Sequence, residues 1–270
     1  MSYINESVIY NIYPLGWCGA PKQNDGQLVY RLDKIYDWIP HLKKMSINCI
    51  VFNPLFESSF HGYDTIDYKK VDCRLGDNES FKKICKTLHE NGIKIILDGV
   101  FNHVGRDFFA FKDVQQNLQN SQYCGWFQNL GFWGSSPKGD PFTYEGWAGH
   151  YDLVKLNLQN QDVVNYLLGA AEFWIDEFDI DGLRLDAADV IDIDIPANLK
   201  SLIFGFTANL HTATTIIGQT AKPLIPQQTT SVTRVFIQAT TTIIILKLLI
   251  RLTVSLQTAV FTETFTPTTL

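Results

Sequence analysis

Two charged residues at the end of a largely apolar run could perform nucleophilic chemistry. Within residues 179–186, Leu183 and Leu185 alternate with Arg184 and Asp186, so the two charged side chains share one face of a predicted strand. A guanidinium group can hold a neighbouring carboxylate ionised and oriented, as a carboxylate nucleophile requires. Because an isolated Arg-x-Asp pair is more often a structural salt bridge, the chemical interpretation needs support from elsewhere in the chain.

That support comes from a second run that ends in polar residues. Residues 93–97 are mostly apolar, and Asp98, Asn102 and His103 follow them, with a break at Gly99. Helical stretches separate the two runs, and parallel strands joined by helices place their carboxyl ends at one edge of a sheet or barrel. The sequence therefore predicts a site at the carboxyl ends of parallel strands.

The elements that must position this site alternate regularly along the chain. Apolar runs predict strands, and apolar residues at helical spacing predict helices, in the order strand 8–13, helix 32–44, strand 48–52, helix 79–90, strand 93–98, helix 161–177 and strand 179–186. This order predicts an α/β fold with parallel strands and right-handed crossovers. A chain of 270 residues is long enough for one TIM barrel, which takes roughly 250 residues.

Four motifs in this sequence resemble those of the α-amylase family of glycoside hydrolases. Residues 98–103 match the pattern D-x-x-x-N-H, and residues 182–186 match G-x-R-x-D. Residues 61–64, His-Gly-Tyr-Asp, are similar to the family's loop after the second strand, and Leu156-Asn157 to a short motif near the end of its inserted subdomain. The motifs stand in the family's order, and the resemblance extends from residue 8 to about residue 195.

The resemblance implies a (β/α)8 TIM barrel of which this chain carries strands 1–4. Residues 1–103 and 159–199 would form the first part of the barrel, and residues 104–158 a small subdomain inserted after strand 3. This segment is rich in Gly, Asn and aromatic residues, and we expect most of its rings to pack its own core and others to stack on sugar.

The family's reaction assigns a role to each motif residue. Members cleave α-1,4 bonds of maltodextrin and starch-type glucans with retention, using two carboxyl groups about 5 to 5.5 Å apart. The resemblance makes Asp186 the nucleophile, with Arg184 keeping it ionised. It also implies four substrate-binding residues, which are Tyr63, Asp98, Asn102 and His103. Tyr63 would stack on the sugar, His103 would donate to a hydroxyl group, and Asp98 would orient its neighbours.

A metal ion is left open by the sequence. The residue equivalent to Asn102 is a calcium ligand in many relatives, so calcium is possible. No acidic cluster in the sequence fixes a calcium loop, however, and no other cofactor is expected.

Composition restricts partners and compartment. The net charge of −6 gives no electrostatic reason to expect nucleic acid or an anionic membrane as a partner. Residues 1–9 lack a basic, apolar leader, and the five cysteines form no C-x-x-C pair, so we expect reduced thiols in the cytoplasm.

Residues 200–270 do not fit the rest of the chain. They contain no Asp, Trp, Tyr or Cys, and Glu263 is their only acidic residue, while Thr and Ile dominate. We interpret this tail as an out-of-frame translation that begins between residues 194 and 202. With free codon choice, joining the last base of each codon to the first two bases of the next converts residues 202–220 into D-F-W-L-Y-G-E-L-A-H-G-D-Y-N-N-W-A-N, which resembles the family's fifth strand.

The chain as written therefore lacks the family's general acid/base. In the shifted frame its Glu codon would straddle Ala208 and Asn209. We expect the chain to be inactive as written, because general acid/base catalysis contributes about 10²- to 10⁴-fold. The alternatives to a hydrolase are a glucanotransferase of the same family, a non-catalytic sugar-binding relative, and an unrelated barrel enzyme for phosphorylated substrates.

Overall fold

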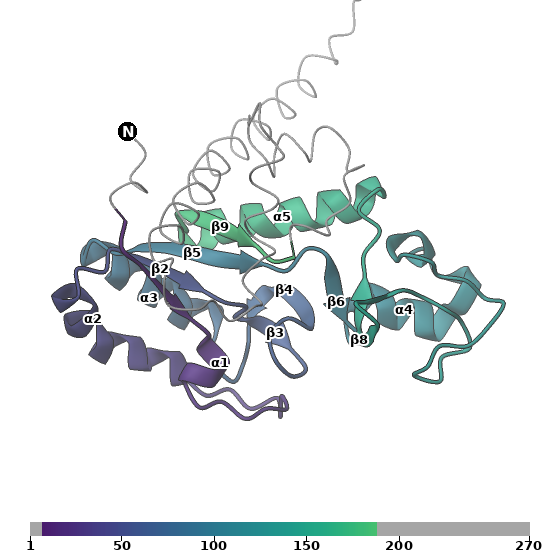
Figure 1. The fold of residues 1–270 in the computed structure, drawn as a ribbon, viewed down its shortest axis with the longest axis horizontal. Coiled ribbons are helices and arrows are strands. Elements are labelled where there is room, and N and C mark those ends of the chain that lie inside the picture. The colour runs from purple at the N-terminus through teal and green to yellow at the C-terminus, as the bar shows by residue number, and fades with distance from the viewer. Residues whose placement is uncertain (1–6, 188–270) are drawn as a thin grey trace, which may run out of the picture.

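A four-stranded parallel sheet is the centre of the fold. The structure, a computed structural model, describes residues 7–187, so the expected tail 200–270 and most of residues 186–199 lie outside the described residues. The strands are β1 (Ile9–Ile12), β2 (Cys49–Phe52), β5 (Lys94–Gly99) and β9 (Gly182–Leu185). They lie in the order β1-β2-β5-β9, each parallel to the next (Figure 1). The four predicted parallel strands are confirmed.

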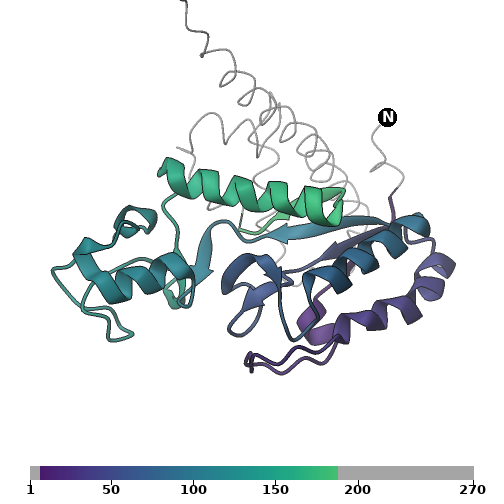
Figure 2. The ribbon, with the colours of Figure 1, turned by 180° about the vertical axis from the view of Figure 1, so that it is seen from behind.

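Helices connect consecutive strands on one side of this sheet. They are α2 (Ile35–Lys44), α3 (Asn78–Glu90) and α5 (Gln161–Phe178), which Figure 2 shows in front of the sheet. The short helix α1 (Pro14–Trp17) follows β1, and a 3-10 turn, η2 (Arg31–Lys34), precedes α2. No helix in the described part of the chain is long and apolar enough to cross a membrane.

The start of α3 and the end of α5 explain why the observed element boundaries differ from the predicted ones. Helix α3 begins with a capping box, in which the Asp77 carboxylate accepts from Ser80 N and Ser80 Oγ accepts from Asp77 N. Helix α5 ends at Asp179, whose φ of 51° is left-handed and stops the helix. Strand β9 therefore begins at Gly182, later than the predicted residue 179.

The two faces of the sheet carry different side chains because strand residues alternate. Toward the helices, Phe52, Leu97 and Leu183 join the main hydrophobic core. On the opposite face, Cys49, Val51 and Ile96 form a second, smaller cluster. This second face is the one that lies inside a (β/α)8 barrel.

The segment between β2 and α3, for which the sequence predicts no strand, contains a hairpin. Strands β3 (Phe56–Ser58) and β4 (Thr65–Val71) pair antiparallel there. Beneath them, the Trp174 ring stacks on Phe56 with centroids 4.4 Å apart, and its Nε1 donates to Tyr68 O at 2.6 Å. Helix α5 thus supports the loop that carries residues 61–64.

Residues after β5 form a lobe beside the carboxyl end of the sheet, as both views show (Figures 1 and 2). A small sheet in the order β6-β8-β7 contains β6 (His103–Gly105), β7 (Gly146–Trp147) and β8 (His150–Lys155). The lobe also holds α4 (Phe109–Asn117), η3 (Leu118–Asn120) and η4 (Cys124–Trp126). The proposed subdomain boundaries 104 and 158 remain predictions.

Most aromatic rings of this lobe lie in its own core, as expected. The buried rings are Phe108, Phe111, Trp126, Phe127, Phe142 and Tyr144. The guanidinium of Arg106 lies over Phe111 and forms a two-pronged ion pair with Asp140, with both distances 2.8 Å. The exposed rings of the lobe are those of Trp133, at 84%, and Phe109, at 42%.

Candidate active site

Three polar residues form a row across the carboxyl ends of β2, β5 and β9. Asp98 is the register partner of Arg184, and Asn53 follows Phe52, which is the partner of Leu97. Because adjacent parallel strands hold equivalent residues side by side, these three side chains meet on the barrel-interior face. We call Asn53, Asp98 and Arg184 the polar row.

Asp98 is the centre of the polar row. It is 3% exposed, and its Oδ2 accepts hydrogen bonds from Arg184 Nη1 and from Asn53 Nδ2, the latter at 3.3 Å. Burial raises the pKa of Asp98 to about 7, although the positive charge of Arg184 opposes this shift. Its Oδ1 is buried and has no hydrogen-bond partner among the described residues.

Asp186 lies at the end of the row, in the turn after β9. Its backbone N donates to Gly99 O at 3.1 Å, which holds the turn against the end of β5. Its carboxylate Oδ1 is 3.4 Å from Arg184 Nη1, and the side chain is 15% exposed. The expected Arg184–Asp186 pair is present, but the guanidinium also binds Asp98, so one cation serves two carboxylates.

His103 is buried beneath an aromatic ring of the inserted lobe. It is 1% exposed, and its imidazole stacks on Trp147 with centroids 5.1 Å apart and planes 24° apart. Burial lowers the pKa of His103 to about 4, so the ring is neutral at pH 7. Asn102 Nδ2 lies 3.2 Å from Nδ1; with this amide donating, the proton is on Nε2, which has no partner within the described part of the chain.

Tyr63 reaches the polar row from the loop after β2. Its phenol oxygen accepts a hydrogen bond from Asn53 Nδ2 at 2.7 Å. Burial, followed by the nearby charge of Asp98, raises the pKa of Tyr63. The loop is fixed by Asp64, whose carboxylate accepts from the backbone N atoms of Phe60 and His61 at 2.7 and 2.9 Å.

Two residues of this arrangement were missed by sequence reasoning. Asn53 is a polar residue directly after an apolar strand, as Asp98 is, so the same pattern could have found it. Trp147 is one of the aromatic residues of the inserted segment, and sequence reasoning assigned it no role of its own. Its stacking on His103 has no local sequence signal, since the two residues are far apart in the chain.

Comparison with known proteins identifies the family. The model named "Alpha amylase, catalytic domain" matches residues 12–232, most of the chain. This chain belongs to the α-amylase family. The match continues past residue 195, where the recognisable motifs end.

Relatives of this α-amylase-family chain include maltodextrin-acting glycoside hydrolases. It is 39% identical over 206 residues to a cyclomaltodextrinase of Thermoanaerobacter pseudethanolicus, covering 70% of this chain and 36% of the relative. It is 37% identical over 208 residues to neopullulanase 2 of Thermoactinomyces vulgaris, covering 70% of this chain and 35% of the relative. The chain thus spans about a third of the length of these curated relatives.

Solved structures of the family have the same fold. The maltose complex of the cyclic α-maltosyl-(1→6)-maltose hydrolase of Arthrobacter globiformis matches with a TM-score of 0.65 and 30% identity, covering 76% of this chain and 50% of the other. The debranching enzyme of Nostoc punctiforme, soaked with acarbose, matches with a TM-score of 0.61 and 33% identity, covering 72% of this chain and 45% of the other. The four-stranded sheet is accordingly part of an α-amylase (β/α)8 barrel.

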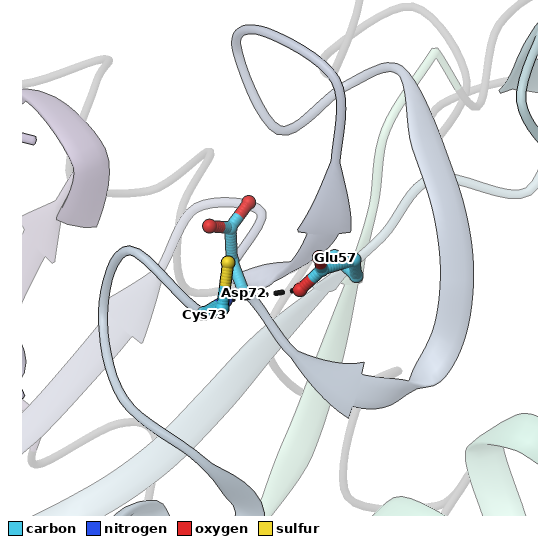
Figure 3. A group of neighbouring side chains, drawn as sticks. All are labelled: Glu57, Asp72 and Cys73. Atoms are coloured by element: carbon cyan, nitrogen blue, oxygen red, sulfur yellow. Dashed lines mark hydrogen bonds between the residues drawn. The ribbon is translucent and has the colours of Figure 1, made fainter. Parts of the chain in front are cut away.

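One group of side chains has the composition of a metal site. Glu57, Asp72 and Cys73 bring three potential ligand atoms within 4.8 Å, and theirs is the one such group found among residues 7–187 (Figure 3). Glu57 Oε2, however, accepts from Cys73 N at 2.9 Å, and Lys70 Nζ is 3.3 Å from Oε1. Protein donors already occupy the Glu57 carboxylate.

A buried arginine neutralises the second carboxylate of this group. Arg74 donates to both oxygens of Asp72, at 2.8 and 2.6 Å, and both side chains are fully buried. The group is thus a structural ion-pair network of the α-amylase-family loop. Asn102 is not one of its three residues, so calcium at Asn102 stays a prediction, and no chemical step below uses a metal.

Proposed function

We propose that this chain carries the nucleophile and part of the sugar-binding site of a retaining glycoside hydrolase for α-1,4-linked glucans of the maltodextrin and starch type. The observation that supports it most is the position of Asp186. Its carboxylate lies beside Arg184 at the carboxyl end of the sheet, and the same guanidinium binds Asp98, which Asn53 connects to Tyr63.

In the proposed reaction, Asp186 attacks the anomeric carbon of the sugar. The bond from this carbon to the glycosidic oxygen breaks, and a glycosyl ester of Asp186 forms. Arg184 favours the charged form of the attacking carboxylate. Water then attacks the ester, releases the sugar and restores the carboxylate.

The buried polar atoms of the site would bind the sugar before this step. Asp98 Oδ1 accepts from a hydroxyl group, and the Nε2 proton of His103 is donated to another, since neither atom has a partner in the described part of the protein. A neutral imidazole is suited to this role because it donates without adding a charge. Tyr63 contributes its ring face as the stacking surface.

The leaving oxygen needs a proton from a second carboxyl group. That role is assigned to no described residue, and the Glu of the shifted frame is our candidate for it. Hydrolysis of a natural glucan by the chain as written is therefore not expected. A substrate whose leaving group needs no proton would still react with Asp186.

α-Maltosyl fluoride is such a substrate and provides the test. Fluoride leaves as the anion, so attack by Asp186 should attach one maltosyl group, which is detected by intact-protein mass spectrometry and fluoride release. Asp186→Asn should give no adduct, because an amide cannot form the ester. Glu90→Gln, at an exposed acid of helix α3, is the matched control. A folded chain that remains unmodified would refute the nucleophile assignment.

The alternatives give different results with maltoheptaose once the missing carboxyl group is supplied. A hydrolase gives shorter oligosaccharides only, whereas a glucanotransferase also gives longer ones, because a sugar replaces water as acceptor. A non-catalytic relative binds the sugar and leaves it unchanged. Mass analysis of the digest separates the three.

The cytoplasm is the compartment that we propose for this reaction. All five cysteines lie within the described residues and none is in a disulfide, as a reducing compartment favours. An intracellular maltogenic amylase of Bacillus subtilis is 41% identical over 162 residues, covering 60% of this chain and 27% of the relative.

A further inference from the structure

Asn53 connects three parts of the candidate site through one side chain. It is 9% exposed, and its Nδ2 donates to Tyr63 OH at 2.7 Å and to Asp98 Oδ2 at 3.3 Å. We propose that Asn53 is a positioning residue, which holds the Tyr63 ring and the Asp98 carboxylate in their sugar-binding orientations. This inference rests on the proposed function.

The contact with Tyr63 joins a loop to the sheet. Tyr63 belongs to the loop between β3 and β4, whereas Asn53 directly follows β2 and is fixed by it. The loop approaches the end of β2 closely, since a Cβ atom on Gly62 would lie 3.0 Å from Pro54 O. Anchoring the phenol oxygen defines the plane of the ring, and a stacking surface must have a defined plane.

The contact with Asp98 makes the two oxygens of its carboxyl group different. Asn53 and Arg184, one from each neighbouring strand, both donate to Oδ2. This leaves Oδ1 unpartnered within residues 7–187 and directs it away from both donors. Without the Asn53 amide, only Arg184 would hold the carboxylate, which could then rotate about its Cβ–Cγ bond.

Two substitutions of nearly the same size distinguish positioning from packing. Asn53→Leu removes both donated hydrogen bonds. Asn53→Asp also removes them when ionised, and it places a second carboxylate beside Asp98. At lower pH the new carboxyl group takes up a proton and can donate one hydrogen bond again, which the leucine cannot do. Asn165→Leu and Asn165→Asp, at an exposed residue of helix α5, are the matched controls.

The first measurement is the rate of maltosyl-enzyme formation from α-maltosyl fluoride against concentration and pH. We expect Asn53→Leu to lower the maximal rate by about a hundredfold, as a misplaced site does. Asn53→Asp should match that loss at pH 8 and regain much of the rate at pH 5, each relative to the wild type. Rates equal to those of the Asn165 variants, or equal losses at both pH values, would overturn the proposal.

The second measurement does not depend on activity. In the full chain labelled with ¹⁵N-asparagine, the Asn53 side-chain amide signals are those lost in Asn53→Leu. They should exchange with water more slowly than those of Asn165 and should shift in both Tyr63→Phe and Asp98→Asn. Exchange as fast as that of Asn165, or no shift, overturns the proposal. If the wild type forms no adduct while these signals behave as expected, the proposed function fails and the positioning contact stands.

Discussion

At the scale of single residues, burial determines which groups of the site are charged. His103 and Asp98 are buried to similar extents, and burial shifts their pKa values in opposite directions, to about 4 and about 7. Each shift favours the neutral form of its group. The site thus concentrates its charge on Arg184 and Asp186, next to the expected point of bond cleavage.

The lowered pKa of His103 predicts a pH dependence of stability. The unfolded chain binds a proton on this histidine below pH 6.5, whereas the folded chain does so only below about pH 4. The contribution of His103 to the free energy of unfolding, roughly 3 kcal/mol, is thus fully present above pH 6.5 and is lost as pH falls to 4. Urea unfolding at pH 7 and pH 4.5 should show a smaller difference for His103→Gln than for the wild type.

Asp98 should have the opposite influence over nearly the same range. Because its folded-state pKa is raised, the folded chain holds the extra proton, and this contribution is lost as pH rises from 4 through 7. The free energy of unfolding should therefore fall less between pH 4 and pH 8 in Asp98→Asn than in the wild type. The same urea titrations, extended to pH 8, measure this difference. An unchanged pH profile in Asp98→Asn would contradict the raised pKa.

At the scale of elements, sequence patterns located the strands of the sheet but not the hairpin. Strands β2 and β5 are recognisable because strands buried on both faces form nearly continuous apolar runs. Strands β3 and β4 contain Glu57, Asp67, Lys69 and Lys70, so they have no such run, and their pairing has register shifts. A short polar hairpin held by side-chain bonds has no hydrophobic period to detect.

The same limit applies to the site. Arg184, Asp186, Asp98 and His103 stand in motifs, so their positions at strand ends could be predicted. Asn53 precedes Pro54, and an Asn-Pro pair indicates a turn as readily as a site. Its role became visible only through its contacts across neighbouring elements.

The buried ion pair of the β3–β4 segment should be important for stability. Arg74 also donates to Pro21 O, Lys22 O and Phe60 O, at 3.0, 3.0 and 2.8 Å. Arg74→Met leaves the buried Asp72 carboxylate uncompensated and should cost about 3–5 kcal/mol in the free energy of unfolding.

Urea unfolding at pH 7 measures this loss, with Lys86→Met as the control. Lys86 lies 3.9 Å from Glu90 in an exposed pair, so its loss should cost at most about 1 kcal/mol. Equal effects of the two substitutions would show that the Arg74 network does not stabilise the fold.

At the scale of the whole molecule, the described residues supply one side of the proposed active site. The sheet has β1 and β9 as its outer strands in the part of the chain that the structure describes, whereas a closed barrel pairs every strand. The carboxyl group that would face Asp186 across the bond is assigned to none of these residues. Attack by Asp186 and protonation of the leaving oxygen should therefore be separable by experiment.

That separation is a prediction for the 270-residue chain. It should react with α-maltosyl fluoride and yet release no detectable sugar from maltoheptaose, as measured by chromatography of the products. The fluoride bypasses general acid catalysis, whereas the natural bond requires it. Release of maltose from maltoheptaose at rates typical of enzymes would show that the general acid is present after all.

The origin of residues 200–270 can be tested on the source DNA. We expect an inserted or deleted base between the codons for residues 194 and 202, with the family's fifth strand encoded in the restored frame. An uninterrupted frame at that point would contradict the frame interpretation. It would leave the described residues and their polar row as they are.

The polar row has a consequence for how the sheet assembles. Each of three strands contributes one polar side chain, and these satisfy one another only in a single alignment. A slip of β9 by one residue would set Leu183 or Leu185 against the Asp98 carboxylate and carry Arg184 to the helix-covered face. A misaligned sheet would thus leave the buried Asp98 carboxyl group without its hydrogen-bond donors, so the polar row should also favour the native strand alignment during folding.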